Sequence, residues 1–121
     1  MIAGLGIDLV SVDRIRRAMA NPKFAERILT SRERSACEGT AEHLAGRWAA
    51  KEAVAKCLGR PLRWHDVEIL SDSNGAPKAW VREGVLPEGW SILVSITHER
   101  TIAAAVAALV APSHAASEPM E

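Results

Sequence analysis

One alanine-rich stretch places the strongest constraint on how this chain can fold. Residues 40–59, TAEHLAGRWAAKEAVAKCLG, consist largely of strong helix formers. Thr40 is suited to the N-cap, and Gly59 is placed to end the helix. Because alanine carries little side-chain bulk, backbone from other elements can approach such a helix closely on several sides. We therefore expect a central helix buried in the middle of a small fold.

The N-terminal segment predicts a strand that leads directly into a helix. Residues 2–10 are rich in Ile, Leu and Val, and Ser11 is a suitable N-cap for a helix over VDRIRRAMA, residues 12–20. Asp8 lies in the middle of this apolar run. A carboxylate is costly to bury, so this position calls for a compensating charge.

Two short helices are predicted between this segment and the alanine-rich helix. In NPKFAERIL, Asn21 is expected to cap a helix with Pro22 at its first position. Thr30 and Glu33 fit a capping box that begins the next helix, which we expect to end near Gly39.

After the alanine-rich helix the periodicity of the sequence changes to two. Four strands are predicted, in DVEIL, KAWV, SILVSIT and TIAAAVAALV. The tight HER connection between the last two indicates an antiparallel meander. Residues 111–121 are small, polar and proline-containing, which is typical of a disordered tail. The chain is thus predicted to be one α+β domain over residues 1–110.

Composition argues against several classes of protein. Lys+Arg 15 equals Asp+Glu 15, which gives no overall electrostatic case for a nucleic acid or a membrane partner. Neither a signal-peptide pattern nor an apolar run long enough to span a bilayer is visible, so a cytoplasmic protein is expected. Cys37 and Cys57 lack the spacing of a zinc site or of a disulfide framework, and we expect them to be reduced.

Two carboxylates and several cations suggest phosphate chemistry. Glu52 and Lys56 share a helix face, and alone they would be an ordinary ion pair worth about 0.3–0.5 kcal/mol. If Asp8 converges on Glu52, the two acids make an oxygen-rich site suited to magnesium, completed by waters and a phosphate. Lys56 can neutralise that phosphate, and Arg47 and Lys51 add phosphate-seeking charge. The combination points to diphosphate chemistry.

These segments together resemble a known family. GLGIDLVSVDRI, FAERILTSRE, LAGRWAAKEAVAKCLG, WHDVEIL, NGAPKAW and VSITHERTIAAAVA follow one another as in the holo-acyl-carrier-protein synthases, the small bacterial type of 4'-phosphopantetheinyl transferase. The resemblance runs from residue 1 to about 109, and GID paired with AGRxAAKEAxxK is highly specific. It implies an α+β 4'-phosphopantetheinyl transferase fold, in which a small antiparallel sheet packs with the long helix. It also implies a homotrimer with active sites between subunits.

The resemblance implies a magnesium-dependent transferase. The family moves 4'-phosphopantetheine from coenzyme A to a serine of apo acyl carrier protein and releases adenosine 3',5'-bisphosphate. By motif match, Asp8 and Glu52 would hold Mg²⁺ on the diphosphate, and Lys56 would stabilise the charge on the leaving phosphate. Glu52, directly or through a metal-bound water, is the candidate base for the serine.

Three further positions match the family pattern. His98, in SITHER, matches a histidine that helps to hold coenzyme A, together with Arg47 and Lys51; without the match it would be read as a hydrogen-bonded turn residue. Arg14 and Lys23 match basic positions that face the acidic recognition helix of the carrier protein. The excess of basic residues in the N-terminal third would otherwise be read as an ordinary solvated helix face. With the resemblance, the acidic helix of the carrier protein becomes its expected partner.

A rival interpretation is a non-catalytic module of the same fold that only binds carrier proteins. The intact Asp8, Glu52 and Lys56 argue against it, because a module without catalysis is expected to lose one of these costly charges. The sequence does not distinguish carriers of fatty-acid, polyketide or peptide synthesis. LGRPLRW, after the helix, is shorter than the glycine-rich segment that the family commonly has there. The resemblance therefore does not define the wall of the coenzyme A pocket in this region.

Overall fold

The structure, a computed structural model, describes residues 1–113. In chain order the elements are β1 (Ile2–Ser11), α1 (Val12–Ala18), α2 (Phe24–Ile28), α3 (Ser31–Ala36), α4 (Ala41–Leu58), the 3₁₀ helix η1 (Trp64–Asp66), β2 (Val67–Ser71), β3 (Pro77–Val81), β4 (Ser91–His98) and β5 (Ile102–Val110). The α+β class and the small antiparallel sheet with a long helix are confirmed. The tail predicted over 111–121 lies mostly outside the described residues.

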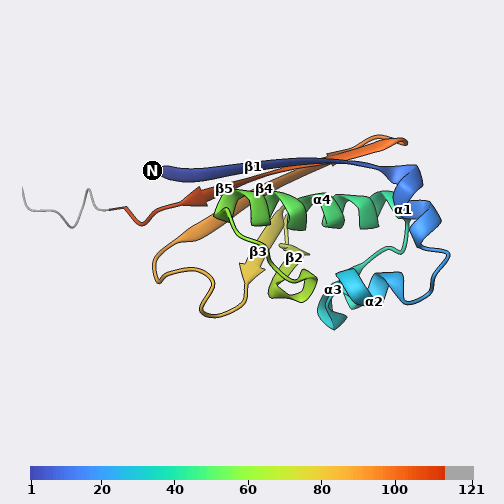
Figure 1. The fold of residues 1–121 in the computed structure, drawn as a ribbon, viewed down its shortest axis with the longest axis horizontal. Coiled ribbons are helices and arrows are strands. Elements are labelled where there is room, and N and C mark those ends of the chain that lie inside the picture. The colour runs from blue at the N-terminus through green and yellow to red at the C-terminus, as the bar shows by residue number, and fades with distance from the viewer. Residues whose placement is uncertain (114–121) are drawn as a thin grey trace, which may run out of the picture.

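The strands form two antiparallel sheets rather than one meander. The larger sheet has the order β1-β5-β4, and the smaller one pairs β2 with β3. The predicted tight turn between β4 and β5 is confirmed, with Glu99 N donating to Ile102 O at 2.8 Å. The meander does not extend further, because β3 pairs with β2 alone and the first strand, β1, takes the other side of β5. All four α-helices lie on one side of the larger sheet (Figure 1).

The long helix α4 begins and ends where its sequence predicts. Thr40 Oγ1 accepts from His43 N at 3.0 Å, which satisfies one of the free N–H groups of the first turn. Gly59 adopts φ 68°, the left-handed conformation that ends helices, and its N–H bonds to Ala55 O. Each of these caps joins residues only a few positions apart in the chain, so both helix ends could be predicted from the sequence.

The alanines of α4 allow β1 to lie directly against the helix backbone. Ala49 and Ala53 are completely buried. A Cβ atom on Gly6 would overlap the carbonyl oxygen of Ala53, and one on Gly4 would overlap the carbonyl oxygen of Cys57. The two glycines therefore fix how β1 sits on α4, and Asp8, two residues after Gly6, is fixed with them.

The other face of the larger sheet is apolar and exposed. Its large side chains are between 41% and 67% exposed: Leu5, Ile7, Leu9, Leu93 and Val106. They form a continuous surface because Leu5 and Leu93 both pair with Ala108 in the middle strand. No helix or strand of residues 1–113 covers this face (Figure 1).

The start of α2 differs from its prediction. The helix begins at Phe24, with Lys23 at the N-cap, rather than at Pro22. Asn21 Oδ1 instead accepts from Lys23 N at 3.0 Å, which closes a local turn before the helix. The Asn21 side chain thus finds its hydrogen-bond partner two residues later, and Pro22 lies within that turn.

The capping box of α3 is confirmed. Thr30 Oγ1 accepts from Glu33 N at 3.2 Å, and Thr30 N donates to Glu33 Oε1 at 2.8 Å. The helix ends at Ala36, three residues before the predicted end at Gly39. Within the described part of the chain, no helix is long and apolar enough to cross a membrane.

Candidate active site

Asp8 and Lys56 meet between β1 and α4. Lys56 Nζ donates to Asp8 Oδ1 at 3.1 Å and to Ile7 O at 3.0 Å. The Asp8 side chain is only 13% exposed, whereas that of Lys56 is 54% exposed. The alternation of the strand turns Asp8 towards α4, on the same face as Gly6 and away from the apolar outer surface. Lys56 supplies the compensating charge that the position of Asp8 requires.

Glu52 belongs to the same side of α4. It is half-buried and precedes Lys56 by one helical turn, so the two side chains share a face. Lys56 pairs with Asp8, across to the neighbouring strand, and the ordinary ion pair with Glu52 is absent from the ion pairs of the described residues. We call Asp8, Glu52 and Lys56 the β1 site.

The donors of the β1 site suit a hard divalent cation. Mg²⁺ prefers carboxylate oxygens and commonly takes one or two of them, with waters and substrate phosphates as its other ligands. Asp8 and Glu52 are the candidate pair, with Asp8 bonded to Lys56 and Glu52 one helical turn before Lys56. Within residues 1–113 there is no cluster of three or more acidic, histidine or cysteine side chains. A metal bound here would therefore draw its remaining ligands from substrate and solvent.

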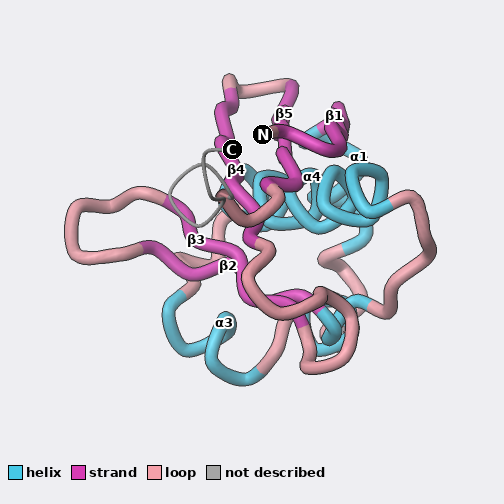
Figure 2. The backbone as a smooth tube through the Cα atoms, turned by 90° about the vertical axis from the view of Figure 1, so that its left-hand side faces the viewer, coloured by secondary structure: helices cyan, strands magenta, loops and turns pink. Residues whose placement is uncertain are grey.

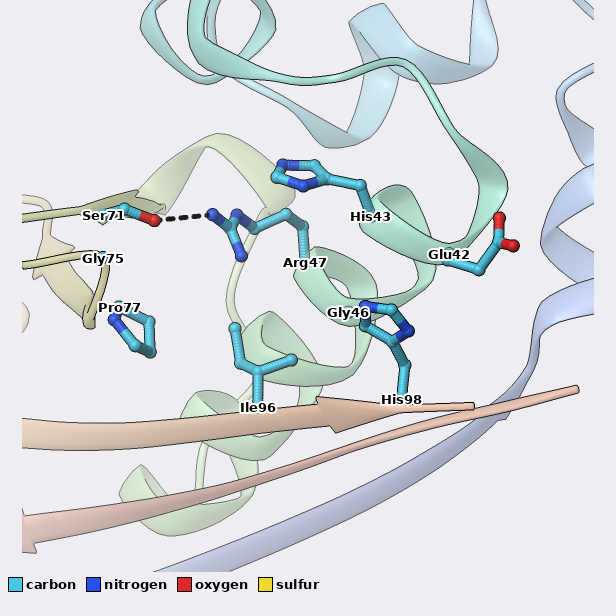
Figure 3. Close-up of a pocket in the computed structure, with 9 residues that line it drawn as sticks. All are labelled: Glu42, His43, Gly46, Arg47, Ser71, Gly75, Pro77, Ile96 and His98. Atoms are coloured by element: carbon cyan, nitrogen blue, oxygen red, sulfur yellow. Dashed lines mark hydrogen bonds between the residues drawn. The ribbon is translucent and has the colours of Figure 1, made fainter. Parts of the chain in front are cut away.

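A second pocket lies at the opposite edge of the larger sheet, along β4 (Figure 3). Its lining residues are Glu42, His43, Gly46, Arg47, Ser71, Gly75, Pro77, Ile96 and His98. Arg47 Nη2 donates to Ser71 Oγ at 3.3 Å. His43 and Arg47 extend from successive turns of α4, and His98 comes from the end of β4 (Figure 3). We call this the β4 pocket.

The β4 pocket holds one formal cation, Arg47, beside two histidines and a single acid, Glu42. Burial lowers the pKa of the Arg47 guanidinium from its usual value, and nearby acids such as Glu33 oppose that shift. Burial also lowers the pKa of His43, and the charge of Arg47 lowers it further. His43 is therefore neutral at neutral pH beside a charged Arg47. Such a surface is suited to anions.

Within a single chain, the β1 site and the β4 pocket lie apart. The hollow beside Asp8 is lined by Ile7, Asp8, Leu9 and Lys56, and shares no residue with the β4 pocket. Asp8 and Ile96 both pair with Ala105, on either side of β5, so about 10 Å of sheet lies between their strands. Figure 2, which looks along the sheet, shows β1 and β4 on opposite sides of β5.

Lys51 does not fit its predicted role as a phosphate ligand. Its Nζ donates to Glu33 Oε1 at 2.7 Å, Ile28 O at 2.7 Å and Trp64 O at 2.8 Å. All three ammonium hydrogens are thus used, and the side chain is only 2% exposed. Burial lowers the pKa of Lys51, and the hydrogen bond to Glu33 opposes that shift. Lys51 joins elements of the fold instead of facing either site.

Glu33 has a larger role than its capping motif indicates. Besides Thr30 and Lys51, it accepts a hydrogen bond from Ile69 N, through Oε2, at 2.7 Å. The carboxylate thereby ties α3, α4 and β2 together in a nearly completely buried position. The sequence signal for Glu33 was only the capping box, since the partners on α4 and β2 are distant in the chain.

Arg14 lies on α1 above an aromatic stack that the sequence did not reveal. Its guanidinium carbon is 5.6 Å from the centre of the Trp48 ring, a cation–π arrangement. Trp48 in turn stacks with Phe24 at 5.9 Å and with Trp64 at 4.4 Å between ring centres. Lys23 is exposed at the start of α2, so both predicted docking residues are at the surface.

Comparison with known proteins agrees with this fold. The family described as the 4'-phosphopantetheinyl transferase superfamily matches residues 4–108, and the chain belongs to that superfamily. Its relatives there are holo-acyl-carrier-protein synthases. That of Geobacillus kaustophilus is 44% identical over 87% of this chain and 86% of its own length. The resemblance read from the sequence is confirmed.

Solved structures of such synthases share the fold. The one from Bacillus anthracis, in complex with CoA (3',5'-ADP), has a TM-score of 0.80 and 33% identity, over 92% of this chain and 98% of its own. The one from Mycobacterium tuberculosis has a TM-score of 0.77 and 38% identity, over 93% of this chain and 100% of its own.

Proposed function

We propose that this chain transfers 4'-phosphopantetheine from coenzyme A to a serine hydroxyl of apo acyl carrier protein. The products are the holo carrier protein and adenosine 3',5'-bisphosphate. The observation that carries the proposal is the β1 site, in which Asp8, Glu52 and Lys56 are all present within a family match that spans the domain. A module that only bound carrier proteins would have no use for two costly carboxylates beside a lysine.

The reaction joins the serine oxygen to the phosphorus that carries pantetheine and breaks the bond from that phosphorus to the leaving nucleotide. Phosphoryl transfer depends mainly on positioning and on charge neutralisation. Lys56 is half-exposed and borders the hollow beside Asp8, so its ammonium can reach the diphosphate and stabilise the charge on the leaving phosphate. The serine proton passes to Glu52, directly or through a water.

We assign Mg²⁺ to Asp8 and Glu52, on the basis of their oxygen donors. A bound Mg²⁺ neutralises charge on the diphosphate oxygens and orients them. Lys56 already donates to Asp8 at 3.1 Å, which holds that carboxylate oriented towards α4. The chain's own contribution is thus to hold two carboxylates and one ammonium around the same phosphate position.

The β4 pocket is assigned to the nucleotide end of coenzyme A. Arg47 and His98, two of the four predicted coenzyme A ligands, both line this pocket. The Bacillus anthracis synthase is described in complex with CoA (3',5'-ADP), and its fold is shared over most of both chains. Ser71, which accepts from Arg47, holds the guanidinium in the pocket wall.

We further propose that the active protein is a homotrimer. The β1 site and the β4 pocket lie on opposite edges of one sheet, so one copy does not bring both to the same ligand. A closed ring repeats one edge-to-edge contact at each interface and thereby joins the β1 site of one copy to the β4 pocket of the next. The exposed apolar face around Leu5, Ile7 and Leu93 supports such an assembly, because a surface of this kind is normally covered.

Carrier docking and location complete the proposal. Arg14 and Lys23 are exposed cations suited to the acidic helix of a carrier protein. Cys37 and Cys57 are free thiols in the structure, which agrees with a reducing compartment, and we assign the reaction to the cytoplasm.

The test is mass spectrometry of apo acyl carrier protein incubated with this protein, coenzyme A and magnesium. The expected result is a gain of one phosphopantetheine per carrier, lost when magnesium is chelated. A carrier variant that lacks the modified serine is the control for specificity. A folded wild-type protein that leaves the carrier mass unchanged but still binds the carrier would favour the binding module instead.

A further inference from the structure

His43 faces the β4 pocket without a role in the proposed reaction. Its backbone N–H donates to Thr40 Oγ1 in the N-cap of α4, and the imidazole takes no part in this cap. The side chain lines the β4 pocket and also an adjoining hollow bounded by Arg32 and Leu70. Arg47 lines both hollows as well, so the imidazole and the guanidinium form one shared wall.

The titratable and charged groups around His43 are two arginines, a second histidine and two acids. Arg47 follows it by one turn of α4, and His98 lines the same pocket from the end of β4 (Figure 3). Arg32 contributes from α3. The acids are Glu42 on α4 and Glu38 in the connection before it. Burial, then Arg47, lowers the pKa of His43, His98 lowers it slightly, and Glu38 only partly offsets these effects. Together, burial and the charge of Arg47 thus disfavour a protonated His43 imidazole.

A phosphate monoester would reverse this balance. Its second pKa is near 6, so it carries between about one and a half and two negative charges at pH 7. An anion of that strength within reach of the imidazole favours the protonated form, which then donates hydrogen bonds from both ring nitrogens. The diphosphate of coenzyme A carries one charge on each phosphorus and belongs to the β1 site. The monoester at the 3' position is the stronger match to the β4 pocket.

We propose that His43, beside Arg47, binds the 3'-phosphate of coenzyme A and takes up a proton from solvent when it does so. The inference rests on the proposed function, since it names a further ligand for the same substrate. His43 is thereby a specificity residue that distinguishes coenzyme A from 3'-dephospho-coenzyme A. It also makes coenzyme A binding stronger as the pH falls from about 8.5 to about 6.5, a range in which the phosphate, with its second pKa near 6, keeps most of its second negative charge.

The test is calorimetric titration of the full-length protein with coenzyme A and, separately, with 3'-dephospho-coenzyme A. Each titration is run at pH 6.5 and pH 8.5, in two buffers of different ionisation enthalpy, so that proton uptake is measured directly. The variant is His43→Gln, which keeps hydrogen-bonding capacity but does not titrate. The matched control is His65→Gln, because His65 is exposed and bonds to Glu26 O outside the β4 pocket.

We expect the wild-type protein and His65→Gln to take up protons on binding coenzyme A, and His43→Gln to take up fewer. His43→Gln should weaken coenzyme A binding roughly tenfold at pH 6.5, the scale of a lost hydrogen bond to a charged group, and much less at pH 8.5. Binding of 3'-dephospho-coenzyme A should be unchanged. An NMR titration of wild-type histidine resonances with adenosine 3',5'-bisphosphate provides a readout that requires no variant to fold.

Two results would overturn the inference. Proton uptake that persists in His43→Gln but disappears in His98→Gln would assign the proton to His98. An equal loss of affinity for both forms of coenzyme A would make His43 a structural residue. Either result can occur while carrier modification in the mass assay proceeds normally, so it would leave the proposed transferase function intact. Absence of both coenzyme A binding and carrier modification would instead remove the proposed function.

Discussion

The two edges of the larger sheet carry opposite kinds of chemistry. The β1 site has two carboxylates and a lysine, fixed by the close contact of β1 with the α4 backbone. The β4 pocket has an arginine and two histidines, with walls drawn from α4, β4 and the β2–β3 hairpin. Under the proposed function, this contrast separates the bond-making chemistry from the binding of the nucleotide. In the proposed trimer, a single chain would then supply half of each active site.

The largest expected effect is on the β1 site. Asp8→Ala and Glu52→Ala should each lower kcat by about a thousandfold or more, because each removes a group that acts on the transferred phosphate. Thermal melting should change little, since loss of one acid lowers repulsion at the site. The measurement is steady-state carrier modification together with circular dichroism. A severe loss of stability in both variants would assign the two acids to the fold.

Mixed trimers test directly whether the two edges cooperate between copies. Asp8→Ala and Arg47→Ala trimers should each be nearly inactive, whereas co-refolded mixtures should recover activity. Random mixing leaves about a quarter of the interfaces with an intact Asp8 facing an intact Arg47. Mixtures of Asp8→Ala with Glu52→Ala should recover no activity, because every β1 site in such a mixture lacks one of its two acids. Equal recovery in both mixtures, or an active monomer on sedimentation, would contradict the shared site.

Lys51 is a cation of α4 that lies in neither the β1 site nor the β4 pocket, so its replacement should affect stability rather than substrate binding. Lys51→Met should lower the free energy of unfolding by about 3–5 kcal/mol, since it leaves the buried Glu33 without its charge partner. The remaining folded protein should keep its KM for coenzyme A. Denaturant unfolding is the measurement, with Lys78→Met as an exposed control. A stable Lys51→Met protein with a raised KM for coenzyme A would restore the original prediction of a phosphate ligand.

Arg14 should show the smallest effect, and only towards the carrier protein. Arg14→Glu is expected to raise the KM for carrier protein about tenfold and to flatten its dependence on salt, with the KM for coenzyme A unchanged. Trp48→Leu should act in the same direction through loss of the guanidinium's aromatic support. Arg17→Glu, on the same helix, is the matched charge-reversal control. Equal losses for both substrates would place Arg14 in the nucleotide site or the fold.

The sequence predicted what depends on neighbours along the chain. Thr40, Gly59 and the Thr30–Glu33 box were identified because each cap involves residues a few positions apart. Lys51 was predicted to add phosphate-seeking charge because it lies in the turn before Lys56 on the same helix. Its ion pair with Glu33 joins residues distant in the chain, so the sequence did not reveal it. The strand order β1-β5-β4, and hence the separation of the two sites, likewise depends on pairing between distant segments.

The pairing of β1 with β5 also has a consequence for biosynthesis. β1 ends at Ser11, and among residues 1–113 it pairs only with β5, which begins at Ile102. The first strand to leave the ribosome therefore has no partner until nearly the whole domain is made. Contacts between such distant segments slow folding, because the entropy of closing a long loop is lost before the pairing is gained. During this interval Leu5, Ile7 and Leu9 are an unpaired apolar strand. Nascent chains of this protein are therefore expected to depend on chaperones until β5 is made.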